Sequence, residues 1–129
     1  LDIVREFINI DRITKIPCCP EHIIGNINLR GEILTLVDIR PVLKLQNSQT
    51  KTTKAVAIDV DEVVAGITVD EVSDVIYFHT QDLKPVPVGI NPNTAQYLQG
   101  TAAYLDKPLN VIDISKMLER GVLTVDRVA

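Results

Sequence analysis

The sequence contains no tryptophan, and its aromatic residues are limited to three tyrosines and two phenylalanines. The hydrophobic content of 46% must therefore come mainly from Ile, Val and Leu, and β-branched residues favour strands. Few aromatic side chains also means few platforms on which nucleic-acid bases could stack. The composition favours a strand-rich core and disfavours binding of single-stranded nucleic acid.

Positive charge is also scarce. The 13 lysines and arginines are outnumbered by 17 aspartates and glutamates, which gives a formal net charge of −4. Lys51 and Lys54 are isolated and form no basic cluster, whereas sequence-independent binding of nucleic acid requires a basic footprint. Nucleic acid is therefore excluded as an expected partner.

Long apolar runs are absent. A membrane-spanning helix needs about eighteen or more consecutive apolar residues, and no stretch approaches that length. No charged, apolar and small-residue leader opens the sequence either. We therefore expect a cytoplasmic protein that is not inserted in a membrane.

Cysteine is limited to the neighbouring pair Cys18 and Cys19. Adjacent cysteines form a disulfide only through a strained ring, and a metal site would need further His or Cys, of which only His22 is near. We expect both thiols to pack in a loop before Pro20, with no metal or cofactor. A small redox or thiol protein that uses Cys18, Cys19 and His22 is the alternative from another functional class.

The segment from Ile23 to Leu43 predicts a strand, a tight turn, a second strand and a short helical turn. Two runs rich in β-branched residues, 23–29 and 33–39, flank Arg30-Gly31-Glu32, which is typical of a hairpin turn. Asp38 can then cap a helical turn, and Pro41 suits its first residues.

The same unit occurs a second time. A shift of 75 residues places Gly25 on Gly100 and Asp38 on Asp113. It also pairs Leu29 with Tyr104, Leu34 with Leu109, Leu36 with Val111, Val37 with Ile112, Ile39 with Ile114, Val42 with Met117 and Leu43 with Leu118. We therefore predict one domain over 1–129 that holds two similar β-subdomains, with a boundary in the polar stretch 46–54 and a short helix over 113–120.

The two copies are predicted to be unequal. Residues 54–69 predict a strand, a turn and a strand directly before Asp70, and Asp70 corresponds to Asp2 in the first copy. The first barrel is therefore expected to lack its opening strands. An open barrel exposes unpaired edge groups, so we expect either a fragment of a longer protein or a homodimer formed by strand exchange or edge pairing.

No set of residues suggests catalysis. Asp38 and Asp113 are equivalent carboxylates, but each lies at a strand end where a cap is needed. The most informative side chain is Arg30, a long cation at a hairpin end between apolar strands, with Arg40 after the next strand. Arginine beside apolar residues is frequent in binding hot spots, which favours an interaction module.

The chain resembles the CheW domain, the coupling module of bacterial chemotaxis. The resemblance spans nearly the whole chain and is carried by Gly25, Asn28-Leu29-Arg30-Gly31, Val37-Asp38-Ile39-Arg40, Gly66-Ile67-Thr68-Val69-Asp70-Glu71-Val72 and Tyr97-Leu98-Gln99-Gly100.

This resemblance implies two SH3-like, five-stranded β-barrel subdomains and a non-catalytic adaptor. Its implied partners are the cytoplasmic tip of a chemoreceptor and the regulatory domain of a CheA-type histidine kinase. It also implies that Arg30 and Val4 contact the receptor. The same domain occurs in the kinase itself and in fusions with a receiver domain, so a regulatory domain of a larger signalling protein is the alternative.

Overall fold

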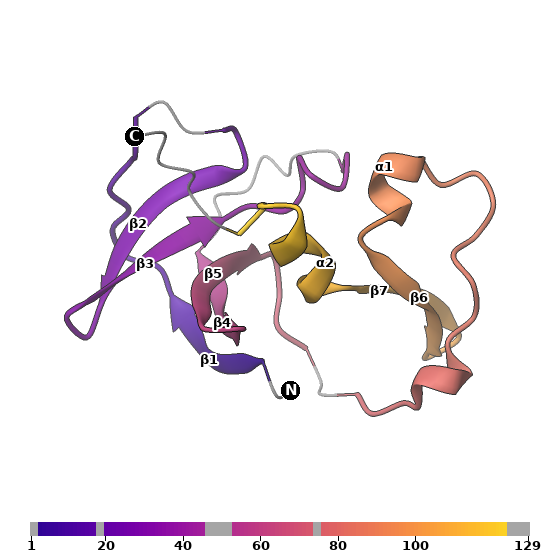
Figure 1. Cartoon of the computed structure of the whole chain (residues 1–129). Helices are drawn as coiled ribbons and strands as arrows, with labels where there is room; N and C mark the ends of the chain where they lie inside the picture. The colour runs from indigo at the N-terminus through magenta and orange to yellow at the C-terminus, as the bar shows by residue number, and fades with distance from the viewer. Residues whose placement is uncertain (1–2, 18–19, 46–52, 74–75, 124–129) are drawn as a thin grey trace.

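The computed structural model describes residues 3–17, 20–45, 53–73 and 76–123, and it is mainly β (Figure 1). The elements in chain order are β1 (Val4–Asn9), β2 (Ile23–Leu29), β3 (Glu32–Val37), β4 (Lys54–Val60), β5 (Val63–Val69), the 3-10 helix η1 (Thr80–Asp82), α1 (Pro92–Ala95), β6 (Leu98–Tyr104), β7 (Lys107–Ile112) and α2 (Ile114–Glu119). The prediction of a strand-rich fold is confirmed. Cys18 and Cys19 lie outside the described residues.

The larger sheet has five strands in the order β1-β4-β5-β3-β2. All neighbouring pairs are antiparallel except β3 and β5, which run parallel through the pairs Leu36 with Gly66 and Val37 with Ile67. After β1 the chain reaches the opposite edge, where Thr14 exchanges two backbone hydrogen bonds of 2.8 Å with Asn26 on β2. The sheet therefore closes on itself as a small barrel.

The smaller sheet consists of β6 and β7. Lys84 joins it through a single bridge to Thr101, with backbone hydrogen bonds of 2.9 and 2.8 Å. Figure 1 shows α2 between this sheet and the five-stranded one. Met117 of α2 is fully buried in a cluster that includes Val37 and Ile67, so α2 packs its apolar side onto the larger sheet.

The two β-hairpins confirm the internal repeat. Each contains a bulge at its glycine, Gly25 or Gly100, where φ is 154° or 158°. A Cβ at Gly25 would lie 2.4 Å from the Thr14 carbonyl oxygen, and one at Gly100 would lie 2.7 Å from that of Lys84. The glycines therefore let an equivalent crossing strand approach each hairpin.

The repeat was assigned incorrectly in one respect. The prediction that one unit has fewer strands is confirmed, but the first unit is not the one that lacks them. The hairpin β4–β5, expected in the second unit, pairs with β1 and β3 of the first. Strand pairing between distant segments is not encoded in local periodicity, and a hairpin can complete either copy of a repeat.

Other expected elements differ in extent. Residues 12–17 and 83–88 contribute only isolated bridges, at Thr14 and at Lys84. The segment 71–73 and 76–78 contains no regular strand. The helix expected over 113–120 is present as α2, and Asp113 caps it by accepting a hydrogen bond from the Lys116 amide at 3.2 Å. The polar stretch 46–52 lies outside the described residues, and the strands before and after it belong to the same sheet.

The core lies on both sides of β3. Leu36 belongs to a cluster built only from β1, β2, β3 and β4, which fills the interior of the barrel. Val37 points the other way, into the cluster that includes α2. Because successive side chains in a strand alternate between faces, β3 is buried on both sides, and both residues have no exposed surface. β3 is therefore a rigid base for the hairpin end that carries Arg30.

Candidate protein-interaction surface

Arg30 is placed by the turn between β2 and β3. Arg30 and Gly31 both have positive φ, 53° and 85°, as a two-residue type I′ turn requires. The Gly31 amide donates a hydrogen bond of 3.0 Å to the side-chain oxygen of Asn28, which fixes the turn. The Arg30 side chain is 78% exposed at the end of this hairpin. The local sequence therefore presents a cation on a rigid support.

Arg30 forms an ion pair with Glu6 of β1. The Arg30 Nη2 atom donates to Glu6 Oε1 at 2.8 Å, and the Glu6 side chain is 29% exposed. An ion pair that is this exposed on the arginine side stabilises the fold by only about 0.2–1 kcal/mol. The ion pair mainly orients the Arg30 side chain. Glu6 holds the guanidinium near β1, and the exposed part of the guanidinium remains accessible to a further carboxylate.

A hollow of about 360 Å³ lies beside this ion pair. Its lining combines apolar and charged residues: Arg5, Glu6, Leu29, Arg30, Glu32, Ile33, Leu34, Ala57 and Val64. Ile33 is 76% exposed at its edge, which is high for a large apolar side chain. Apolar surface bordered by paired charges is typical of contacts between proteins.

Val4, the second predicted contact, lies at the start of β1 and is partly buried. It pairs with Ile58 of β4 and does not line the hollow. The structure therefore brings Arg30 to Glu6 and places Val4 two residues from Glu6 on the same strand. Sequence reasoning named Arg30 and Val4 but missed Glu6, whose only sequence cue is its position two residues after Val4.

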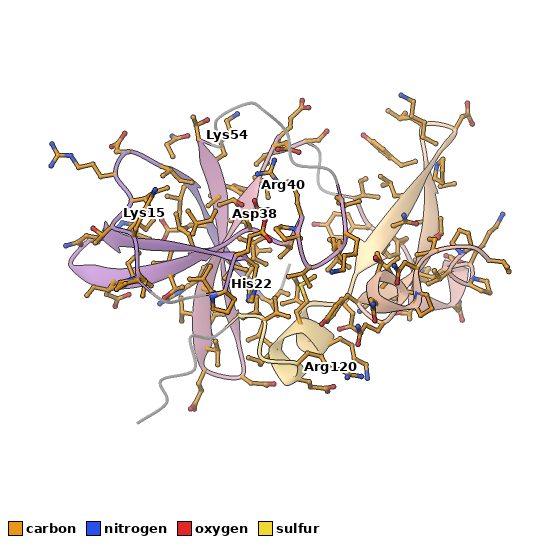
Figure 2. All side chains as sticks on the ribbon, turned by 90° about the horizontal axis from the view of Figure 1, so that it is seen from above. Lys15, His22, Asp38, Arg40, Lys54 and Arg120 are labelled. Carbon is orange, nitrogen blue, oxygen red and sulfur yellow. The ribbon has the colours of Figure 1, made fainter. Side chains whose placement is uncertain are left out.

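A second ionic cluster lies where β3 and β5 end. Arg40 binds Asp38 through contacts of 2.9 to 3.3 Å and approaches Asp70 at 3.5 Å. Figure 2 shows the Asp38 and Arg40 side chains close together. Burial alone would raise the pKa of Asp38, but hydrogen bonds and charge from Arg40 outweigh it and hold that pKa below its usual value. This cluster fixes the chain directly after β3. Arg40 is mostly buried in it, whereas Arg30 is largely exposed.

Residues 1–122 match the family model of the CheW-like domain. The chain belongs to this family. It is 33% identical over 98% of its length to a chemotaxis protein CheW of Klebsiella aerogenes, 77% of which is covered. It is 30% identical over 83% of its length to the CheW of Bacillus subtilis, 69% of which is covered.

A solved structure confirms the fold of this CheW-like domain. The scaffolding protein TtCheW of Thermoanaerobacter tengcongensis superimposes with a TM-score of 0.72 at 30% identity, covering 85% of this chain and 75% of that one. The predicted CheW resemblance is therefore confirmed by family, relatives and fold.

Asp113 and His22 are the remaining chemical candidates that lie among the described residues. Asp113 caps α2, and the backbone carbonyl of His22 accepts a 2.7 Å hydrogen bond from the Asp38 amide. The His22 Nε2 atom is buried and makes no hydrogen bond within the described residues. Within the described ranges, no three metal-binding side chains gather at one point. In the same ranges, no helix combines the length and apolar character of a membrane span.

Proposed function

We propose that this CheW-like domain is a non-catalytic adaptor that couples chemoreceptors to a CheA-type histidine kinase in the cytoplasm. The family and the chemotaxis relatives support this function. The observation that carries the proposed contact is the Arg30 guanidinium, held at a hairpin end by Glu6 at 2.8 Å beside an exposed Ile33. The proposed receptor partner is its cytoplasmic tip, and the proposed kinase partner is its regulatory domain.

The hollow beside Arg30 suits the side of a helix. An apolar side chain of the helix would cover Ile33, and a neighbouring carboxylate would take the exposed donors of Arg30. Replacing the Glu6 contact by a contact to the partner's carboxylate costs little free energy, because the Arg30 side chain of the ion pair is mostly solvated. Glu6 would then orient Arg30 in the free protein, which lowers the entropic cost of ordering a long side chain on binding.

Replacing Arg30 with alanine is expected to weaken binding to a receptor-tip fragment by about 1–3 kcal/mol, the range of an interface hot spot. Its high exposure means that folding is retained. Calorimetric titration of the fragment measures the affinity, and a thermal melt checks the fold. Arg120→Ala, at an exposed position just after α2, is the matched control and should bind normally (Figure 2). Equal affinity of a folded Arg30→Ala variant and the parent would refute the contact.

Val4→Ala is expected to reduce receptor affinity through lost apolar contact while the melting temperature changes little. Val4 is only partly buried and belongs to neither core cluster. The same titration and melt serve as readouts. If the melting temperature falls strongly and the affinity does not, Val4 acts in packing and the receptor contact is excluded.

Two finer proposals concern the partners. A pull-down with isolated kinase regulatory domain should retain Arg30→Ala as well as the parent, because Arg30 is proposed to contact the receptor. Failure of both Arg30→Ala and the parent to bind that domain would favour the alternative, a regulatory domain within a larger signalling protein.

Self-association by strand exchange or edge pairing is also proposed, and light scattering across protein concentration measures it.

A further inference from the structure

Arg5 lies at a bulge in β1. The ladder between β1 and β4 shifts register between Val4 and Glu6, so Arg5 is an extra residue of β1. Successive side chains of a regular strand point to opposite faces, and a bulge breaks this alternation. Arg5 and Glu6 both line the hollow beside Arg30. The bulge therefore adds a second arginine to the edge of the hollow.

Arg5 differs from Arg30 in its charge environment. Arg30 is paired with Glu6, whose Oε1 atom lies 2.8 Å from the Arg30 Nη2 atom. Arg5 is exposed, and among the described residues no carboxylate forms an ion pair with it. A carboxylate that approaches Arg30 must compete with Glu6, whereas the donors of the Arg5 guanidinium are available. Arg5 is therefore the free cation of the hollow.

Glu32 is the corresponding free anion. It begins β3, is exposed and lines the same hollow. Like Arg5, it forms no ion pair in the part of the chain that the structure describes. In the larger sheet β4 and β5 separate β1 from β3, and Ala57 of β4 and Val64 of β5 line the hollow too. An apolar middle is therefore flanked by one free cation and one free anion from different strands.

We propose that Arg5 and Glu32 determine which receptor helix binds in this hollow and in which direction it lies. The partner is an amphipathic helix whose apolar side covers Ile33 and Val64, with a carboxylate facing Arg5 and a basic side chain facing Glu32. A helix in the reversed direction would set like charges against each other, which costs binding free energy. This inference rests on the proposed receptor function and adds the residues that select the partner.

Exposed charges at the edge of an interface act mainly on association. They attract a partner of complementary charge and repel a partner with like charges, whereas their direct contribution to affinity is small because water and salt screen them. Changes at Arg5 and Glu32 should therefore alter the association rate and its salt dependence more than the dissociation rate.

Stopped-flow mixing with the receptor-tip fragment measures the association rate. At low salt, Arg5→Gln should associate about threefold and Arg5→Glu about tenfold more slowly than the parent. Both differences should vanish in about 1 M salt, where the screening length is about 3 Å. Arg12→Glu is the matched control, because it makes the same change of charge at an exposed position outside the lining of the hollow. It should associate as the parent does.

Charge reversal in the fragment tests the pairing. Each aspartate or glutamate on the helix surface of the fragment is changed singly to lysine, and each lysine or arginine singly to glutamate. One acid-to-lysine change should restore association of Arg5→Glu and leave Glu32→Lys slow. A base-to-glutamate change at another position should restore Glu32→Lys. Thermal melts of the chain variants check that each is folded.

The outcomes separate this inference from the receptor function. Unchanged association of a folded Arg5→Glu variant, together with weakened binding by Arg30→Ala, would overturn the selection by Arg5 and keep the receptor contact. Equal rescue by every acid-to-lysine change would also overturn it, because net charge alone would then explain the rates. Absence of any binding by the parent would reject the receptor function, and this inference with it.

Discussion

Replacing Gly25 with alanine is expected to lower the free energy of unfolding by about 4 kcal/mol, at the upper end of single-residue effects. The new Cβ would lie 2.4 Å from the Thr14 carbonyl oxygen and 2.7 Å from an Ile13 methyl group. The first obstacle is backbone, and the Thr14–Asn26 bridge holds it in place. The positive φ of 154° adds strain. Urea unfolding followed by circular dichroism measures the loss.

Gly89→Ala is the matched control. Gly89 also has a positive φ, 102°, but a Cβ there would meet no atom within 4 Å. It therefore reports backbone strain alone, which costs about 1–3 kcal/mol. A Gly25→Ala variant no less stable than Gly89→Ala would show that the crossing strand moves aside easily, and the barrel closure described above would be wrong.

Asp38→Asn is expected to destabilise the fold by about 3 kcal/mol at neutral pH, because it leaves the charge of Arg40 poorly compensated in a mostly buried site. The two side chains are only 14% and 18% exposed. The matched control is Asp113→Asn at the equivalent position of the repeat. Ser115 stands there in place of Arg40, and asparagine caps a helix about as well as aspartate. Urea unfolding should show little change for this control.

The cost of Asp38→Asn should depend on pH in one direction. The folded pKa of Asp38 lies below its unfolded value, so its stabilising effect is complete above the unfolded pKa and is lost as the pH falls through the folded pKa. The difference in unfolding free energy between parent and variant should therefore shrink when the pH is lowered from neutral into the acid range. A difference that stays constant with pH would contradict the assigned ion pair.

Local sequence predicted the hairpins well because their turns are encoded by the residues themselves. Arg30-Gly31 and Asp61-Glu62 adopt the positive φ values of tight turns and lie where the apolar runs are interrupted. α2 was also predictable, from the Asp113 cap and Gly121 after its end. α1 was missed although Asn91 and Pro92 are typical of a helix start, because a single turn leaves no apolar periodicity.

The candidate site was predicted in part. The turn marked Arg30, but its partner Glu6 lies 24 residues earlier, on a strand that reaches it only after the barrel closes. The pairing of the β4–β5 hairpin with β3, which joins Leu36 to Gly66, likewise could not be predicted from local sequence. No periodic pattern reports which distant strands become neighbours. Asp38 was expected to cap a turn, and its side chain does accept a hydrogen bond from the Arg40 amide at 3.0 Å. Its second hydrogen bond, from the Arg40 guanidinium, could be found only in the structure.

The parallel pairing of β3 with β5 has a consequence for the order of folding. The β6–β7 hairpin joins neighbouring segments and can form within about 1–10 μs. The five-stranded sheet cannot be completed until residues some 30 to 50 positions apart have met, as Leu36 meets Gly66 and Asn9 meets Lys54. Such long-range closure raises contact order and slows folding. During synthesis, the β2–β3 hairpin therefore emerges with an unpaired edge and must wait for β5 before its surface is protected.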